Sequence, residues 1–228
     1  MDFAPDETSV AVRDVAAEVF ARHQTDWAST FGRAPGSDDA PFDTALWTSL
    51  IDAGVIALPL PDDLGGDGVD VLSLLPLLRR MGESAAVTPA PGTLAAAVVL
   101  AVADDGPTRR RLSASIADGG WMAVAINEPG DALTDTPRTT VRDSRLNGTK
   151  VAVLAADGAS ALLVTTDAGV IAVDPGVDGV RVHRTPTSSG WGEYTVTFDD
   201  VAVADTDTVA TSTAGLRDVH RILLAAYA

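Results

Sequence analysis

GGWMAVAI at residues 119–126, followed directly by NEPG at 127–130, marks the point where the sequence changes its structural pattern. Before this stretch, apolar residues recur with a period close to 3.6, which is typical of amphipathic helices. After it, short apolar segments with a period of 2 alternate with turn residues, which is typical of strands. The sequence therefore predicts an α+β fold, in which an all-helical domain precedes a β-domain.

The first 118 residues are expected to form the N-terminal helical domain. Segments 10–20, 42–53, 72–81 and 108–117 have amphipathic spacing, and a loop rich in Gly, Pro and Asp is expected at 31–41. Asp6 or Thr8 is suited to cap the first helix, and Gly54 is suited to end the second. Segment 93–102 is apolar on all sides, so it is expected at the centre of the core.

Residues 119–210 are expected to form the β-domain. Strands are expected at 121–126, 138–142, 150–154, 160–165, 170–173, 179–183 and 194–198. Short strands at this spacing predict a β-barrel or a β-sandwich. A helical pattern restarts at Ala214, so residues 211–228 are predicted to be only the start of a C-terminal helical domain.

Composition narrows the classes of partner and site. The net charge of −16 makes nucleic acid and anionic membranes unfavourable partners, because both require a basic face. The absence of cysteine rules out disulfides and thiolate metal sites and favours a cytoplasmic location. The three histidines are far apart in the sequence, so no metal site is predicted. The longest apolar run, 94–103, is too short to span a bilayer.

A second segment, LNGTKV at 146–151, follows NEPG after about twenty residues. Together they resemble the middle domain of acyl-CoA dehydrogenases, flavoenzymes whose TEPGAGSD and LNGTKxWIT segments wall the flavin pocket. PDDLGGDG at 61–68 resembles the family's PxExGGxG loop, and YTVTFDDVAV at 194–203 resembles its xFxDVxVP strand. MGES at 81–84 and PAP at 89–91 resemble in particular members that act on steroid side chains. The whole chain resembles the first two domains of the family.

The resemblance implies FAD as the cofactor. It places the flavin pocket at six positions: Ile126, Asn127, Gly130, Ala152, Val153 and Leu154. Three family side chains are replaced, because Leu133 stands for a Ser, Ala152 for the Trp that covers the isoalloxazine, and Leu154 for a Thr. The pocket is therefore expected to lack several flavin contacts. The alternative is that VAVLAA at 151–156 is simply a buried strand.

In the family reaction a Glu carboxylate removes a proton from the acyl α-carbon, and FAD accepts a hydride from the β-carbon. The resemblance places that Glu in the C-terminal domain, beyond Ala228, so no catalytic residue is predicted in this chain.

Three hypotheses follow. The first is an acyl-CoA dehydrogenase subunit with a degenerate flavin site, which pairs with a homologous subunit in a hetero- or homo-oligomer. This complex would act on an acyl-CoA thioester, and a steroid side chain is one candidate for the acyl group. The second is a complete FAD-dependent acyl-CoA dehydrogenase seen as a truncated chain. The third is a scaffold or binding protein on the same fold without a redox role. Flavin absorbance, alone and with a partner, would separate them.

Overall fold

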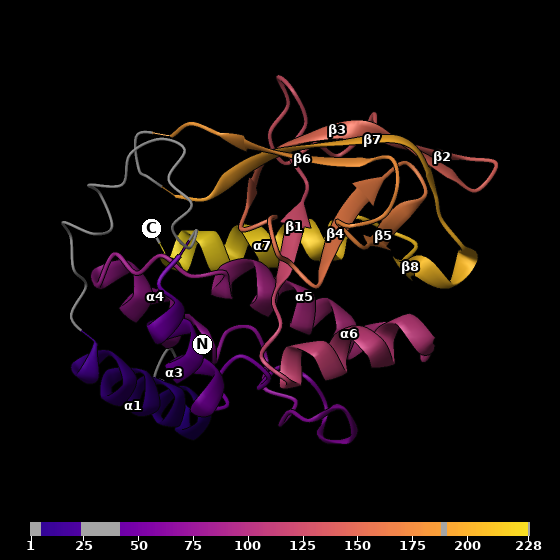
Figure 1. Cartoon of the computed structure of the whole chain (residues 1–228). Helices are drawn as coiled ribbons and strands as arrows, with labels where there is room; N and C mark the ends of the chain where they lie inside the picture. The colour runs from indigo at the N-terminus through magenta and orange to yellow at the C-terminus, as the bar shows by residue number, and fades with distance from the viewer. Residues whose placement is uncertain (1–5, 24–41, 188–190, 228) are drawn as a thin grey trace.

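The computed structural model describes residues 6–23, 42–187 and 191–227 (Figure 1). The loop expected at 31–41 lies outside these residues. The helices are α1 (Glu7–Arg22), α3 (Thr44–Asp52), α4 (Leu75–Glu83), α5 (Ala90–Val102), α6 (Pro107–Ala117) and α7 (Ala214–Tyr227). The strands are β1 (Met122–Ala125), β2 (Thr140–Arg142), β3 (Arg145–Leu154), β4 (Ala161–Thr166), β5 (Gly169–Val173), β6 (Val180–Thr185), β7 (Glu193–Ala202) and β8 (Thr208–Ala210). The α+β prediction is confirmed.

The described strands form two four-stranded sheets, in the orders β1-β4-β5-β8 and β2-β3-β7-β6. The second sheet is wholly antiparallel, whereas β1 pairs with β4 in parallel and the other pairs of the first sheet are antiparallel. Neither sheet closes on itself. The pairing therefore favours the sandwich alternative over a barrel.

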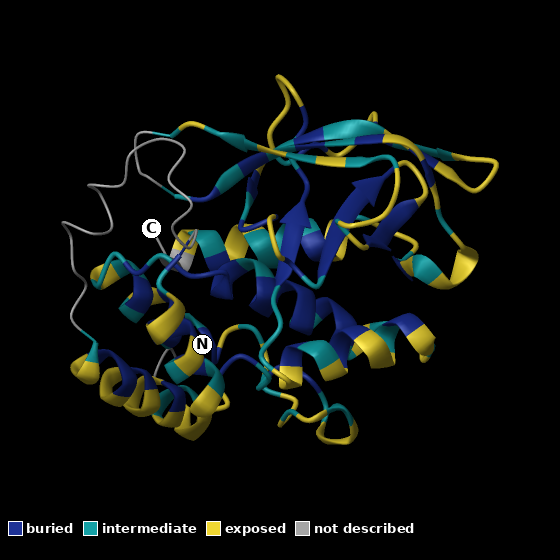
Figure 2. Ribbon diagram, viewed as in Figure 1, coloured by how far each residue is buried: buried dark blue, intermediate teal, exposed yellow. Residues whose placement is uncertain are grey.

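The helices, the first sheet and the second sheet form three layers. The first sheet is the middle layer, so it is covered on both faces. Along β1, Met122 and Val124 belong to the core shared with the helices, whereas Ala123 and Ala125 belong to the core between the two sheets. Successive side chains of a strand point to opposite faces, so a strand in the middle layer needs apolar residues at every position. Figure 2 shows strands β1, β4 and β5 of this middle layer as buried along their whole length.

Helix α5 lies against the first sheet, and α7 crosses both α4 and α5 (Figure 1). Leu216 and Leu223 of α7 are 1% and 0% exposed and join the helical core. The central position expected for segment 93–102 is confirmed, since most residues of α5 are buried. The helical core thus includes residues from each of the three predicted domains, 1–118, 119–210 and 211–228. No helix in the described ranges is long and apolar enough to cross a membrane.

The sequence signals for the helix ends also agree with the structure. Asp6 caps α1 by accepting a hydrogen bond from the Ser9 N–H at 2.7 Å. Helix α3 ends at Asp52, and Gly54 follows it with a left-handed φ of +72°. Glycine adopts that conformation without the strain caused by a Cβ atom.

Candidate functional site

The segment Asn127–Gly130 leaves β1 and enters a tight turn. Glu128 and Asp131 exchange two backbone hydrogen bonds, and each N–H donates to the carbonyl oxygen of the other residue at 2.9 Å. Pro129 takes the second position of this turn, and Gly130 takes the third with a φ of +77°. Such a sequence fits a type II turn, which requires a left-handed third residue. The Pro-Gly pair therefore defines the shape of this exposed turn.

Directly behind the turn lies a buried ion pair. Lys150 is the only lysine of the chain, and its side chain is 0% exposed. Its Nζ donates to Glu128 Oε1 at 2.9 Å, to Thr165 Oγ1 at 2.9 Å and to the Ile126 carbonyl oxygen at 3.2 Å. All three Lys150 donors are thus used, as a buried ammonium group requires.

The Glu128 carboxylate has further partners. Thr139 donates its N–H and its hydroxyl to Oε1 at 2.9 and 2.7 Å, and Arg138 donates its N–H and its Nε–H to Oε2 at 2.8 and 3.3 Å. Burial by itself would raise the pKa of Glu128, but the hydrogen bonds from Lys150, Thr139 and Arg138 outweigh it and lower the pKa from 4.5 to about 2. A carboxylate enclosed in this way is a structural anchor, since a general base needs access to its substrate.

This anchor joins segments that are distant in the sequence. Glu128 follows β1, Lys150 belongs to β3 and Thr165 belongs to β4, so the pair connects the two sheets. Burial lowers the pKa of Lys150, and the Glu128 carboxylate opposes that effect. Removing one member would leave the other charge buried without its partner, which costs more than the pair itself contributes.

Strand β3 contains a β-bulge beside the turn. Its pairing with β7 shifts between Lys150 and Val153, and Ala152 has a φ of +52°. The Val151 N–H does not join the ladder to β7 and donates instead to the Asn127 carbonyl oxygen at 3.0 Å. The bulge therefore brings the two segments of the predicted pocket side by side.

The six predicted pocket residues differ in what they offer a ligand. Gly130 and Ala152 are exposed, and Asn127 and Leu154 are half-buried. Ile126 and Val153 are buried in different layers, Ile126 in the helical core and Val153 between the sheets. The side chains of these two residues serve packing, so only their backbone groups are available for binding.

The loop after the turn folds back on its own chain. Asn127 Oδ1 accepts the Leu133 N–H at 2.9 Å, and Leu133 has a left-handed φ of +53°. The Leu133 side chain packs against the helical core. The position at which the resemblance implies a hydroxyl is therefore occupied by an apolar side chain that contributes to packing.

The two segments of the predicted pocket offer main-chain groups to a ligand. The exposed turn at Gly130 and the bulge at Ala152 provide main-chain groups beside a left-handed glycine, a geometry suited to close approach of a ligand. The side chains of Leu133, Ala152 and Leu154 supply neither the hydroxyl groups nor the aromatic ring that the resemblance implies. These three side chains do not match the flavin contacts that the resemblance implies, so no chemical step through FAD is derived. Among the described residues, no group of three or more His, Asp or Glu side chains is placed to hold a metal ion.

The Glu128–Lys150 pair is the feature that the sequence analysis missed. Both residues lie inside the motifs that were singled out, but nothing in the motifs predicted their contact. The available signal was a single lysine in an otherwise apolar strand segment, KVAVLAA at 150–156. A charged residue in such a segment requires a buried partner, and Glu128 directly follows the other buried strand.

Comparison with known proteins supports the resemblance. No protein-family model matches the chain. The chain is 42% identical to the acyl-CoA dehydrogenase FadE28 of Mycobacterium tuberculosis over 211 residues, which cover 92% of this chain and 56% of FadE28. Its fold matches a variant of the Tcur3481–Tcur3483 steroid ACAD with a TM-score of 0.81 and 30% identity, over 97% of this chain and 62% of that chain. It also matches the ChsE4–ChsE5 complex from Mycobacterium tuberculosis with a TM-score of 0.80 and 25% identity, over 98% of this chain and 61% of that chain.

The fold therefore has the architecture seen in acyl-CoA dehydrogenases. The chain belongs to the acyl-CoA dehydrogenase family. It spans little more than half the length of FadE28.

Proposed function

We propose that the chain is a subunit of an acyl-CoA dehydrogenase complex, in which its own flavin pocket is degenerate and a homologous subunit holds the working site. The complex would dehydrogenate an acyl-CoA thioester between the α- and β-carbons. The observation that carries this proposal is the exposed Ala152 at the β3 bulge, where the resemblance implies a Trp over the flavin ring.

Two further positions support a degenerate pocket. Leu133 packs against the helical core, and Leu154 has no hydroxyl group. The loss of one hydrogen bond costs about 1 kcal/mol, and more when the abandoned partner is buried. Three lost contacts together correspond to a weakening of about two powers of ten or more in the dissociation constant.

The partner and the substrate class are inferred from the relatives. Two similar structures are those of the ChsE4–ChsE5 complex and of the Tcur3481–Tcur3483 steroid ACAD, and each of these names contains two components. A homologous second subunit and a CoA thioester with a steroid side chain are therefore our proposals for this chain. The division into domains 1–118, 119–210 and 211–228 also remains a proposal.

The retained backbone supports a second candidate, a protein that binds FAD in its own pocket. The turn with Gly130 at φ +77° and the hydrogen bond from the Val151 N–H to the Asn127 carbonyl oxygen hold the two predicted pocket segments side by side. The two candidates differ in whether the isolated chain binds FAD tightly.

Isothermal titration of FAD into the isolated chain tests the proposal. We expect a dissociation constant weaker than about 100 μM, and about 100-fold tighter binding by the variant L133S/A152W/L154T, which restores the three family side chains. The control is A202W, which adds the same ring at an exposed position of β7. Submicromolar binding by the unmodified chain would refute the degenerate pocket. If the restored variant bound no more tightly than A202W, these three positions would not be the cause.

A further inference from the structure

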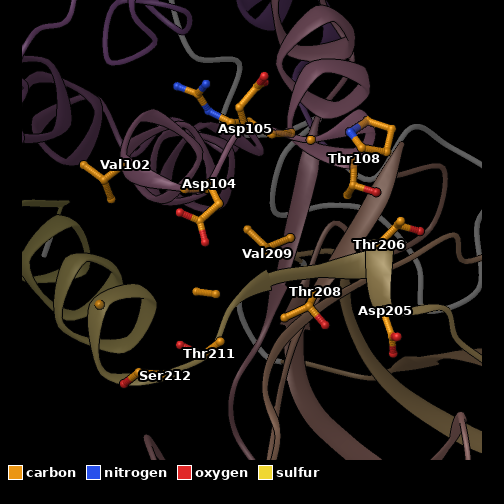
Figure 3. Close-up of a pocket in the computed structure, with 16 residues that line it drawn as sticks. Val102, Asp104, Asp105, Thr108, Asp205, Thr206, Thr208, Val209, Thr211 and Ser212 are labelled. Carbon is orange, nitrogen blue, oxygen red and sulfur yellow. The ribbon is translucent and has the colours of Figure 1, made fainter.

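A groove of about 530 Å³ lies where the end of α5 and the start of α6 face β8 and the start of α7. Figure 3 shows Asp104 on the α5–α6 side of this groove and Asp205 on the β8 side. Both residues are exposed, and none of the six predicted pocket residues lines the groove. The two segments of the predicted pocket are therefore held by other contacts, at the ends of β1 and β3.

The end of β3 and the residue after it have an unfavourable backbone conformation. Ala152 and Ala155 both have a left-handed φ of +52°. In that conformation the Cβ atom of an alanine lies too close to the following carbonyl oxygen. Such residues persist only where the surrounding structure holds them in place. The segment 151–155 therefore depends on contacts from outside β3.

The residues that flank β1 supply a hydrogen bond at each end of this segment. At one end, the Val151 N–H donates to the Asn127 carbonyl oxygen at 3.0 Å. At the other end, the Trp121 Nε1–H donates to the Ala155 carbonyl oxygen at 2.9 Å. Residues 152–154 thus lie between two points at which the chain is fixed to its neighbour.

The Trp121 side chain is itself closely surrounded. Its ring packs edge-on against Phe42, with the ring centroids 5.1 Å apart and the ring planes at 81°. A Cβ atom on Gly158 would lie only 3.1 Å from the Cζ2 atom of the indole, so the backbone there covers the ring closely. The half-buried Trp121 packs against both the helical core and the core between the sheets. These contacts fix the direction in which the indole N–H points.

Phe42 connects this indole to the helical layer. Its ring centroid lies 6.4 Å from that of Trp47 on α3, and both residues are buried. The Trp47 Nε1–H donates to the Gly119 carbonyl oxygen at 3.0 Å, two residues before Trp121. The three rings therefore join α3 to the residue that holds Ala155.

We propose that Trp121 is a positioning residue of the predicted pocket, which holds residues 152–154 in place beside the turn at 127–130. Its indole N–H fixes the Ala155 carbonyl group and thereby the second left-handed alanine. The role of the pocket rests on the proposed function, whereas the hydrogen bond acts whether or not FAD binds.

Hydrogen exchange of the whole chain, measured by mass spectrometry without any ligand, tests this proposal. The variant W121F keeps an aromatic ring next to Phe42 and removes the N–H donor. We expect exchange at residues 152–155 to rise about tenfold, as the loss of one hydrogen bond implies. The matched control is W47F, which removes the indole donor to Gly119. It should change exchange at residues 152–155 less than about twofold.

The variant L133S/A152W/L154T, which restores the three family side chains, gives a second readout. In that background W121F should weaken FAD binding about tenfold, and W47F should weaken it less than about twofold. If the restored variant bound FAD no more tightly than the unmodified chain, the proposed cause of the degenerate pocket would fail. The exchange data would still decide the role of Trp121.

Several results would overturn the proposal. Unchanged exchange at residues 152–155 in W121F would show that the indole N–H does not hold them. An equal rise over the whole chain, or equal effects of W121F and W47F in either experiment, would assign Trp121 to general packing.

The variant F42L keeps the proposal testable if W121F does not fold. It leaves the indole N–H in place and removes the ring that orients the indole. Exchange at residues 152–155 should then rise about threefold, and the absence of a rise would contradict the proposed role of Trp121.

Discussion

Replacement of Lys150 by Met is the most informative test of how the pocket segments are held together. Met is similar in length and apolar, so the variant K150M keeps most of the packing and removes the charge. Glu128, which is 3% exposed, would then lose the 2.9 Å bond from Nζ while it remains buried. The Thr165 hydroxyl and the Ile126 carbonyl would also lose a donor.

Two arguments give the size of the effect. Breaking a buried ion pair by removing one partner costs about 3–5 kcal/mol, and Glu128 keeps its Thr139 and Arg138 donors, which favours the lower end. The net effect of burial and of all the hydrogen bonds to Glu128, a pKa of about 2 instead of 4.5, corresponds to about 3 kcal/mol of stability at neutral pH, and Lys150 supplies one of those bonds. We therefore expect K150M to lose about 3 kcal/mol of unfolding free energy at pH 7.

The pH dependence gives a second readout. Because folding lowers the pKa of Glu128, its contribution is present above pH 4.5 and is lost as the pH falls toward 2. The difference in stability between the unmodified chain and K150M should shrink over that interval.

Urea unfolding followed by tryptophan fluorescence measures both quantities, with R181M as the control. Arg181 and Asp199 form an ion pair at 3.1 Å in the same sheet, but both side chains are more than half exposed. R181M should therefore cost less than about 1 kcal/mol. If K150M cost no more than R181M, or if its deficit did not change with pH, the buried pair would not anchor the pocket segments as argued.

Three further predictions concern single positions. Gly130→Ala should lower the free energy of unfolding by about 1–2 kcal/mol, because alanine is strained at a φ of +77° even though its Cβ atom would meet nothing within 4 Å. An unchanged midpoint of urea unfolding would show that the turn relaxes. Leu223→Ala should lower the free energy of unfolding by about 2–5 kcal/mol, since the Leu223 side chain on α7 is 0% exposed and packs into the helical core. Ile222→Ala, at a residue that is 36% exposed, should lower it much less, and equal losses would contradict the packing of α7. Burial lowers the pKa of His220 to about 4, so the free energy of unfolding should fall as the pH drops from 6.5 toward 4. His220→Leu should remove this pH dependence from unfolding curves measured across the interval. A pH dependence that persisted would originate in another group.

The helices could be predicted from the sequence because their signals are local. Asp6 precedes the first amphipathic segment and caps α1, and the apolar segment at 93–102 forms most of the largely buried helix α5. The start of β3 was less clear, because Asn147-Gly148 has the composition of a turn, yet both residues lie within the strand. Strand β8, with only three residues, was missed, since it depends on pairing with the distant β5.

The candidate site shows the same division between local and distant effects. The turn at Pro129-Gly130 follows from its own sequence, because the two residues have the conformations that a type II turn requires. The left-handed Ala152 could not be predicted, since alanine has no preference for that conformation and adopts it here only at the bulge against β7. The Glu128–Lys150 contact spans 22 residues and depends on the packing of both sheets, so no local pattern contains it.

The visible absorption spectrum of the purified protein tests the central proposal most directly. The chain should be produced alone and together with a homologous acyl-CoA dehydrogenase subunit, and the ratio of bound flavin to protein should be measured in each preparation. A degenerate pocket predicts a colourless isolated chain and a yellow complex. A stoichiometric yellow flavin in the isolated chain would show that Leu133, Ala152 and Leu154 do not impair the pocket and would contradict the proposed role.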